Sequence, residues 1–154
     1  MDKWKPIIKN LLLAFVLVSV GYALGKNTSV QTGGSGGNVK PGKHLRVYYT
    51  HATVRCETCN NIEKKTRELL ESKFKKEIAD GRIEWQVVNF QENDAFARQF
   101  DVTTSGVIAV LMDGGRVLDY ERLDGVWTLL GEPAAFNAYL EKAFQKLMAS
   151  GGIK

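Results

Sequence analysis

The sequence has little cysteine and little net charge outside its first residues. Only two cysteines occur among 154 residues, which excludes a disulfide-scaffolded miniprotein and a four-cysteine zinc ribbon. The net charge is +4, and Lys3, Lys5, Lys9 and Lys26 against Asp2 give 4 − 1 = +3 for residues 1–26. The rest of the chain therefore carries only 4 − 3 = +1, so the charge gives no reason to expect a nucleic-acid partner.

Several common catalytic patterns are also missing. The sequence contains no phosphate-binding glycine motif, no Ser/His/Asp arrangement and no paired-carboxylate site. Hydrophobic residues make up 44% and charged residues 25%, which excludes a disordered chain and a polytopic membrane protein. The length suits one domain of ordinary size.

An apolar run near the start of the chain follows a basic flank. Residues 11–24 carry no charge, and Lys3, Lys5 and Lys9 precede or interrupt the run, as in an export signal. Residues 11–24 would rise about 21 Å as a helix, short of the roughly 30 Å of a bilayer core. Residues 7–24 can span it if the Lys9 side chain snorkels to the interface. We predict that residues 1–25 are an uncleaved signal anchor or a signal peptide cut near Tyr22–Ala23.

The same flank predicts the orientation of the chain. Basic residues remain on the cytoplasmic side, so the C-terminal part is expected on the extracytoplasmic (periplasmic) side. The protein would then be a single-pass protein of the cell membrane, or a secreted one if the segment is removed. Residues 26–42 include the sequence TGGSGG and predict a flexible Gly-rich linker.

Residues 43–149 have the periodicity of an α/β domain, and residues 150–154 are expected to be a disordered tail. The expected elements are strands over residues 45–50, 82–90, 107–112 and 116–123, a long helix burying one face of residues 62–78, a short helix capped by Asn93 or Asp94, and a terminal helix over 136–147 that begins near Pro133. This is a β-α-β-α-β-β-α order, with a four-stranded mixed sheet flanked by helices. The first three strands should be parallel, with the last antiparallel at one edge.

The two cysteines, Cys56 and Cys59, lie between the first strand and the long helix. A helix N-terminus favours an anion, so a thiolate there is stabilised and reactive. We expect Cys56 to be the attacking residue and Cys59 the resolving residue. Arg55 should stabilise a Cys56 thiolate, Glu57 should oppose it, and His51 is a candidate proton-transfer group.

Other interpretations of the cysteine pair stay open. It can be a structural disulfide, or a metal site formed by Cys56, Cys59 and His51. Trp85 and Trp127 are interpreted as packing residues, and His44 as a solvated one.

A CxxC motif at a strand-to-helix junction in this element order resembles the thioredoxin-like family over residues 43–148. More narrowly, residues 48–63 (YYTHATVRCETCNNIE), the apolar segment before them and DVTTSGVIAV after them are similar to the nitrophenyl-compound nitroreductase subunit ArsF family. The resemblance implies that Cys56 and Cys59 cycle between dithiol and disulfide without a cofactor. The sequence departs from thioredoxins at Arg55, where they have Trp, and in residues 103–107, which lack their cis-proline.

These observations predict a membrane-tethered thiol–disulfide oxidoreductase. Its partner would be a redox protein or a membrane complex, with a nitroreductase-type system as one electron acceptor. The alternative is a non-catalytic accessory module, or a metal-carrying module, of a membrane complex.

Overall fold

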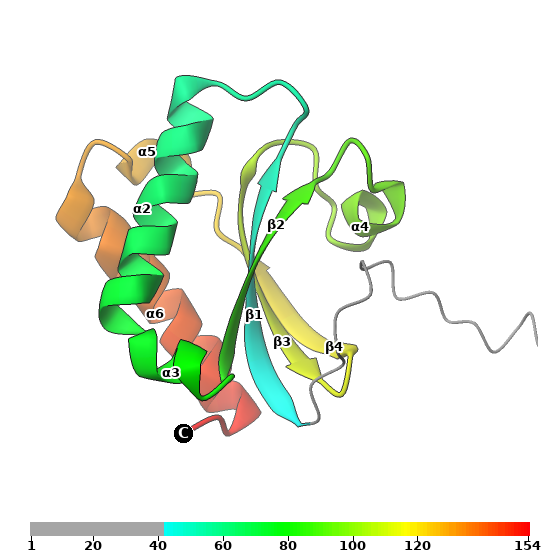
Figure 1. Ribbon diagram of the computed structural model, residues 1–154, viewed down its shortest axis with the longest axis vertical. Coiled ribbons are helices and arrows are strands. Elements are labelled where there is room, and N and C mark those ends of the chain that lie inside the picture. Colours follow the sequence, from blue (N-terminus) through cyan, green and yellow to red (C-terminus); the bar gives the residue numbers. More distant parts are fainter. Residues whose placement is uncertain (1–41) are drawn as a thin grey trace, which may run out of the picture. The chain divides into compact units, whose positions relative to one another are not determined.

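A computed structural model describes residues 42–154 of the chain and shows four strands and five helices in that range (Figure 1). In chain order they are β1 (Lys43–His51), α2 (Glu57–Lys73), α3 (Lys75–Ala79), β2 (Ile83–Asn89), α4 (Asp94–Gln99), β3 (Gly106–Asp113), β4 (Arg116–Arg122), α5 (Val126–Leu129) and α6 (Pro133–Gly151). The predicted membrane segment (residues 7–24) and nearly all of the predicted linker lie outside the described residues. Within residues 42–154, no helix combines the length and the apolarity needed to cross a bilayer.

The strands form one mixed sheet in the order β2-β1-β3-β4. The β1 and β2 strands are parallel, as predicted, and β4 is antiparallel to β3 at an edge, also as predicted. The β3 strand runs antiparallel to β1, so the prediction that the first three strands are all parallel is wrong.

The short connection between β2 and β3 explains this reversal. The last residue of β2, Asn89, pairs with His51, and the first residue of β3, Gly106, pairs with Thr50. The connection therefore begins and ends beside the same end of β1. A parallel β3 would require the chain to return along the nine residues of β1, about 30 Å. The six-residue α4 rises only about 9 Å, too little for that return.

Helices cover both faces of the sheet (Figure 1). Leu45, Val47 and Tyr49 of β1 point into the larger core, which α2 and α6 close. Tyr48 points to the opposite face, where Phe96 and other side chains on and around α4 form a second, smaller core. This alternation follows from the two-residue period of a strand, and it leaves β1 buried on both faces.

The predicted long helix is interrupted at Phe74. There α2 ends and the backbone turns to φ −120° and ψ 22° before α3 begins. The Phe74 ring is buried and packs edge-on against Phe144, with the ring centroids 5.7 Å apart. Side-chain packing thus accompanies a break that helical periodicity alone does not indicate. The chain reverses after Asp80 with Gly81 at φ 74°, as the sequence predicts.

The C-terminal residues differ from the expected disordered tail. Helix α6 continues through Gly151, and Gly152 ends it in the left-handed conformation at φ 68°. The amide of Ile153 donates to the carbonyl of Met148 over 2.9 Å, and the Ile153 side chain packs against the larger core. A glycine that reverses the chain before an apolar residue is a common helix ending, and it orders this segment.

Candidate functional site: a disulfide at the start of a helix

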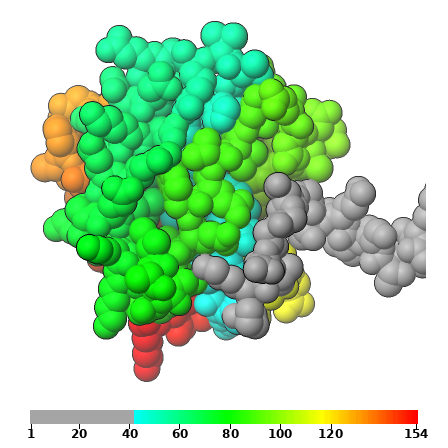
Figure 2. Space-filling view, in the orientation of Figure 1, coloured from blue at the N-terminus to red at the C-terminus, as the bar shows by residue number. Residues whose placement is uncertain are grey.

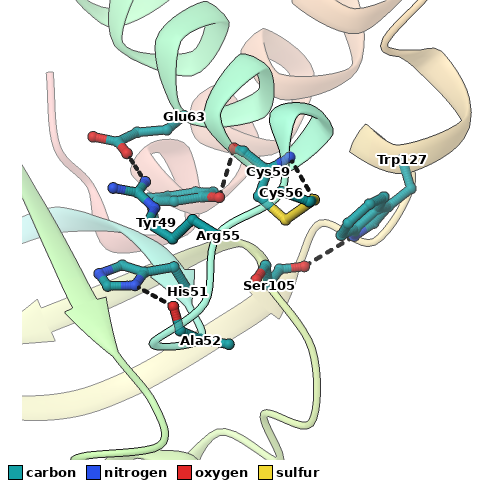
Figure 3. The surroundings of a disulfide bond; sticks show 9 residues. All are labelled: Tyr49, His51, Ala52, Arg55, Cys56, Cys59, Glu63, Ser105 and Trp127. Atoms are coloured by element: carbon teal, nitrogen blue, oxygen red, sulfur yellow. Dashed lines mark hydrogen bonds and ion pairs between the residues drawn. A yellow bond between two sulfur atoms is a disulfide. The ribbon is translucent and has the colours of Figure 1, made fainter.

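The two cysteines lie at the N-terminus of α2 and are joined by a disulfide (Figure 3). Cys56 is the N-cap residue of α2, in an extended conformation with φ −87° and ψ 164°. Its Sγ accepts a hydrogen bond from the backbone N–H of Cys59 over 3.1 Å. The first turn of α2 therefore directs an N–H group and the positive end of the helix dipole toward this sulfur, which stabilises negative charge on it.

The two cysteines differ sharply in access. Cys56 is exposed, whereas Cys59 is only 6% exposed and belongs to the buried residues of α2. The segment between β1 and α2 lies at the surface, at the top of the domain in Figures 1 and 2. A partner can therefore reach Cys56 but not Cys59, which is the asymmetry expected of an attacking and a resolving cysteine.

The loop before Cys56 is held by side-chain hydrogen bonds. The backbone N–H of Thr53 donates to Oε1 of Gln91 over 2.9 Å, and Nδ2 of Asn89 donates to Oγ1 of Thr53 over 3.0 Å. These bonds tie the loop to the last residue of β2 and to the segment that follows it. The residue after Thr53, Val54, is 87% exposed, so an apolar side chain projects into solvent two positions before Cys56.

A buried tyrosine supports the cysteine turn from below. Tyr49 of β1 is fully buried, and its hydroxyl donates to the backbone carbonyl of Cys59 over 2.6 Å. Burial raises the pKa of Tyr49 above its ordinary value, although nearby Arg55 opposes the shift. The hydroxyl therefore stays protonated near neutral pH and remains a hydrogen-bond donor to the turn.

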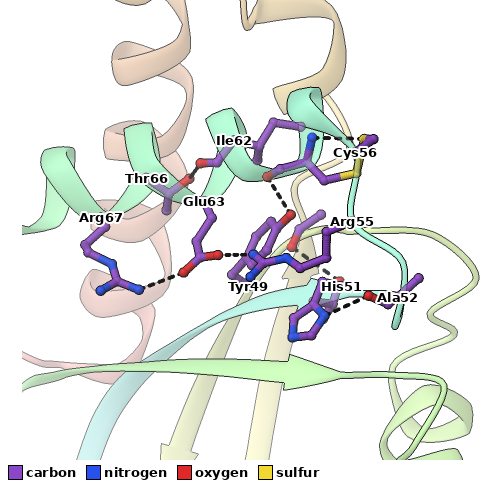
Figure 4. Close-up of polar contacts among 12 residues, drawn as sticks. Tyr49, His51, Ala52, Arg55, Cys56, Ile62, Glu63, Thr66 and Arg67 are labelled. Carbon is purple, nitrogen blue, oxygen red and sulfur yellow. Dashed lines mark hydrogen bonds and ion pairs between the residues drawn. A yellow bond between two sulfur atoms is a disulfide. The ribbon is translucent and has the colours of Figure 1, made fainter.

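Arg55 is engaged with other groups than the cysteines. Its guanidinium pairs with the carboxylate of Glu63 and lies 5.5 Å from the ring centroid of Tyr49 (Figure 4). Burial lowers the pKa of Arg55, but the hydrogen bond to Glu63 and the contact with Tyr49 outweigh that effect, and the pKa lies above its ordinary value. The predicted influence of Arg55 on a Cys56 thiolate remains a prediction, and in the disulfide form the guanidinium is directed elsewhere.

The other predicted modulating residues are less closely engaged with the disulfide. Glu57 is the exposed first residue of α2, where a carboxylate interacts favourably with the helix dipole. The Nδ1 atom of His51 lies 2.9 Å from the backbone carbonyl of Ala52, and the ring is stacked on Tyr49. In Figures 3 and 4 the imidazole is turned away from the disulfide.

The metal alternative has no preformed set of ligands in residues 42–154. No group of three His, Cys, Asp or Glu side chains there is placed to hold an ion, and Cys56, Cys59 and His51 do not form one. His44, predicted to be solvated, is instead buried, with Nε2 3.6 Å from a carboxylate oxygen of Glu84.

The segment before β3 is fixed near the disulfide by Trp127. Its indole Nε1 donates to the backbone carbonyl of Ser105 over 2.9 Å, as Figure 3 shows. Oγ1 of Thr50 donates to the carbonyl of Gly106 over 3.3 Å. Trp127 packs against the larger core, as predicted, and it also holds the loop that takes the place of the missing cis-proline segment.

Sequence reasoning did not identify Tyr49 and Glu63 as parts of the site. The alternation of β1 could have placed Tyr49 on the face that α2 covers. The spacing of Cys59, Glu63 and Arg67 at four-residue intervals could have placed these three on one side of the helix.

Comparisons with known proteins give only structural likenesses. No family model and no curated protein matches the chain. Among solved structures, thioredoxin from Fasciola hepatica is 18% identical, with 65% of this chain and 81% of that one covered at a TM-score of 0.39. Mitochondrial thioredoxin 3 from Saccharomyces cerevisiae, in its oxidised form, is 18% identical, with 70% and 81% covered at a TM-score of 0.41. Trxlp from Edwardsiella tarda is 20% identical, with 63% and 82% covered at a TM-score of 0.40.

The arrangement of the sheet defines the fold. A parallel β1–β2 pair, an antiparallel β3–β4 hairpin and the order β2-β1-β3-β4 with helices on both faces constitute a thioredoxin-like fold. The Cys56–Cys59 disulfide lies where β1 leads into α2. The domain is thus a thioredoxin-like domain that carries a CxxC disulfide.

Proposed function

We propose that this protein is a thiol–disulfide oxidoreductase in which Cys56 exchanges bonds with a partner and Cys59 completes the exchange. The observation that carries the proposal is the unequal exposure of two disulfide-bonded cysteines at one helix N-terminus. A disulfide with one accessible sulfur can be attacked by an external thiolate. Once reduced, the same sulfur lies where the helix stabilises a thiolate.

The exchange proceeds in two steps that balance in electrons and protons. In the dithiol form, the Cys56 thiolate attacks one sulfur of a partner disulfide, forms a mixed disulfide and expels the other partner sulfur as a thiolate, which takes up a proton. The Cys59 thiolate then attacks Sγ of Cys56 and expels the second partner thiolate. The domain loses two electrons and two protons, the partner gains them, and the Cys56–Cys59 bond is formed.

The proposal includes a location outside the cytoplasm. The basic flank and apolar residues 7–24 support a membrane tether with the domain on the extracytoplasmic side, where disulfides persist. A redox protein or membrane complex near the membrane surface would be the partner. The sequence resemblance suggests a nitroreductase-type system as the electron acceptor.

A redox titration of the full-length chain in detergent tests the proposal. Thiol labelling followed by mass spectrometry should show both cysteines converting together and reversibly between disulfide and dithiol. Reduction of insulin by dithiothreitol should be accelerated by the wild type and not by Cys56→Ser, whereas Cys59→Ser should accumulate a mixed disulfide. Equal behaviour of wild type and Cys56→Ser would refute the proposal. A pair that stays oxidised below about −300 mV would instead be a structural disulfide.

A further inference from the structure

The carboxylate of Glu63 lies between two arginines beside the disulfide (Figure 4). One oxygen pairs with the guanidinium of Arg55, and the other accepts a hydrogen bond from Arg67 over 2.7 Å. The Glu63 side chain is only 14% exposed. Solvent screens such a carboxylate less than a fully exposed one, and each of its oxygens has a guanidinium partner.

The position of Arg55 follows from these contacts. The residue directly precedes Cys56, yet its guanidinium is directed along α2 to Glu63 and over the ring of Tyr49. Among the hydrogen bonds of residues 42–154, none joins Arg55 to Sγ of Cys56. Figures 3 and 4, drawn from different directions, both show the guanidinium against the ring of Tyr49, turned toward Glu63 and away from the sulfurs.

We propose that Glu63 is a positioning residue that limits the reactivity of Cys56 by holding Arg55 away from its sulfur. The inference deepens the proposed function and rests on it, because it requires a Cys56 thiolate. Reduction of the disulfide creates a second anion on the residue that directly follows Arg55 in the chain. Glu63 competes with that anion for the guanidinium, so less positive charge is available to stabilise the thiolate.

The charges of Arg55, Glu63 and Arg67 show which contact the competition depends on. Two arginines and one carboxylate leave a net charge of +1, and the Glu63 pair decides where the nearer positive charge is placed. Loss of Glu63 would release Arg55 toward the sulfur. Loss of Arg67 would leave the Arg55–Glu63 pair intact. The two arginines therefore provide a matched comparison on the same carboxylate.

The alkylation rate of Cys56 measures this effect. Iodoacetamide reacts with the reduced full-length chain carrying Cys59→Ser, at a pH below the midpoint of the alkylation profile. In that background Glu63→Gln should react about threefold faster. An opposite charge near a thiol increases the thiolate fraction by about tenfold or more, and the accompanying loss of nucleophilicity cancels about half of that gain on a logarithmic scale. Arg67→Gln should react no faster than the parent chain.

A double-mutant cycle separates positioning from a direct charge effect. If Glu63 acts through Arg55, Glu63→Gln accelerates alkylation in the presence of Arg55 and not in an Arg55→Gln background. The same acceleration in both backgrounds, or none in either, would overturn the inference. Glu63→Asp keeps the charge and should restore a rate near that of the parent. If Glu63→Gln fails to show the cooperative thermal unfolding of the parent, Glu63→Ala, which also removes the charge, takes its place in the cycle.

The proposed function and this inference fail in different ways. If the cysteine pair shows no reversible two-electron couple in the wild type, the proposed function fails and the inference fails with it. If the couple is present and the cycle shows no interaction between positions 55 and 63, only the inference fails.

Discussion

Replacing Tyr49 with phenylalanine removes one buried hydroxyl and keeps the ring that packs beneath the disulfide. The hydroxyl donates to the Cys59 carbonyl over 2.6 Å, and the tyrosine is fully buried, with an exposure of 0%. A neutral hydrogen bond of this kind contributes about 1 kcal/mol. The Cys59 carbonyl still faces the N–H group four residues later in α2, so it is not left without a partner.

We therefore expect Tyr49→Phe to lower the free energy of unfolding by about 1 kcal/mol. For a domain of about this size, that loss lowers the melting temperature by about 4 °C. Thermal unfolding of the full-length protein in detergent, followed by circular dichroism, measures the change. Tyr120→Phe is the matched control, because Tyr120 is 41% exposed and its hydroxyl should contribute within about 0.5 kcal/mol.

The redox consequence of Tyr49→Phe follows from where the bond is made. The hydroxyl binds the backbone and not a sulfur, so the disulfide and dithiol forms should lose the same stability. The equilibrium with glutathione should then match that of the wild type. An unchanged melting temperature would refute the assigned hydrogen bond, and a loss above about 3 kcal/mol would refute the assumption that the ring keeps its place.

Three further predictions concern other parts of the domain. Val54→Ala should slow insulin reduction about fivefold and leave reaction with dithiothreitol unchanged. The reason is that the exposed apolar side chain contributes about 1 kcal/mol only when a protein substrate covers it. Equal effects on both substrates would contradict this. Burial raises the pKa of Glu84, but hydrogen bonds, including one from Arg46 at 2.7 Å, outweigh burial and lower it below the ordinary 4.5. Its stabilising contribution is therefore present above pH 4.5 and is lost as the pH falls through the lowered value. Urea unfolding should separate Glu84→Gln from wild type at pH 6 and progressively less at acidic pH. A difference that grows on acidification would contradict the sign. Gly151→Ala would place a Cβ 2.6 Å from Cδ1 of the buried Leu111, so urea unfolding should show a free energy of unfolding lower by about 1–2 kcal/mol. A higher free energy of unfolding, from helix propensity alone, would show that the Leu111 side chain moves freely.

Features that depend on short stretches of chain were predictable. The strands, the turn at Asp113–Gly115 and the capping of α4 by Asn93 follow from local periodicity and turn chemistry. The β3–β4 turn indeed has Gly114 at φ 54° and Gly115 at φ 88°. The placement of the cysteines at a helix start was predictable for the same reason.

Features that depend on distant residues were not predictable in this way. The direction of β3 follows from a connection that stays at one end of β1. The prediction of a third parallel strand assumed a crossover that α4 is too short to make. The break at Phe74 is accompanied by packing on Phe144, and the ordered C-terminus by the packing of Ile153. Each depends on a surface supplied by another part of the chain.

The amino-acid sequence by itself determined where the candidate site lies, because CxxC spacing and a following helix are properties of adjacent residues. Only the tertiary structure decided the surroundings of that pair. It buried Cys59, brought Tyr49 of β1 under the turn and directed Arg55 to Glu63. Electrostatic interactions and hydrogen bonds depend on distance in space, and the local sequence does not specify those distances.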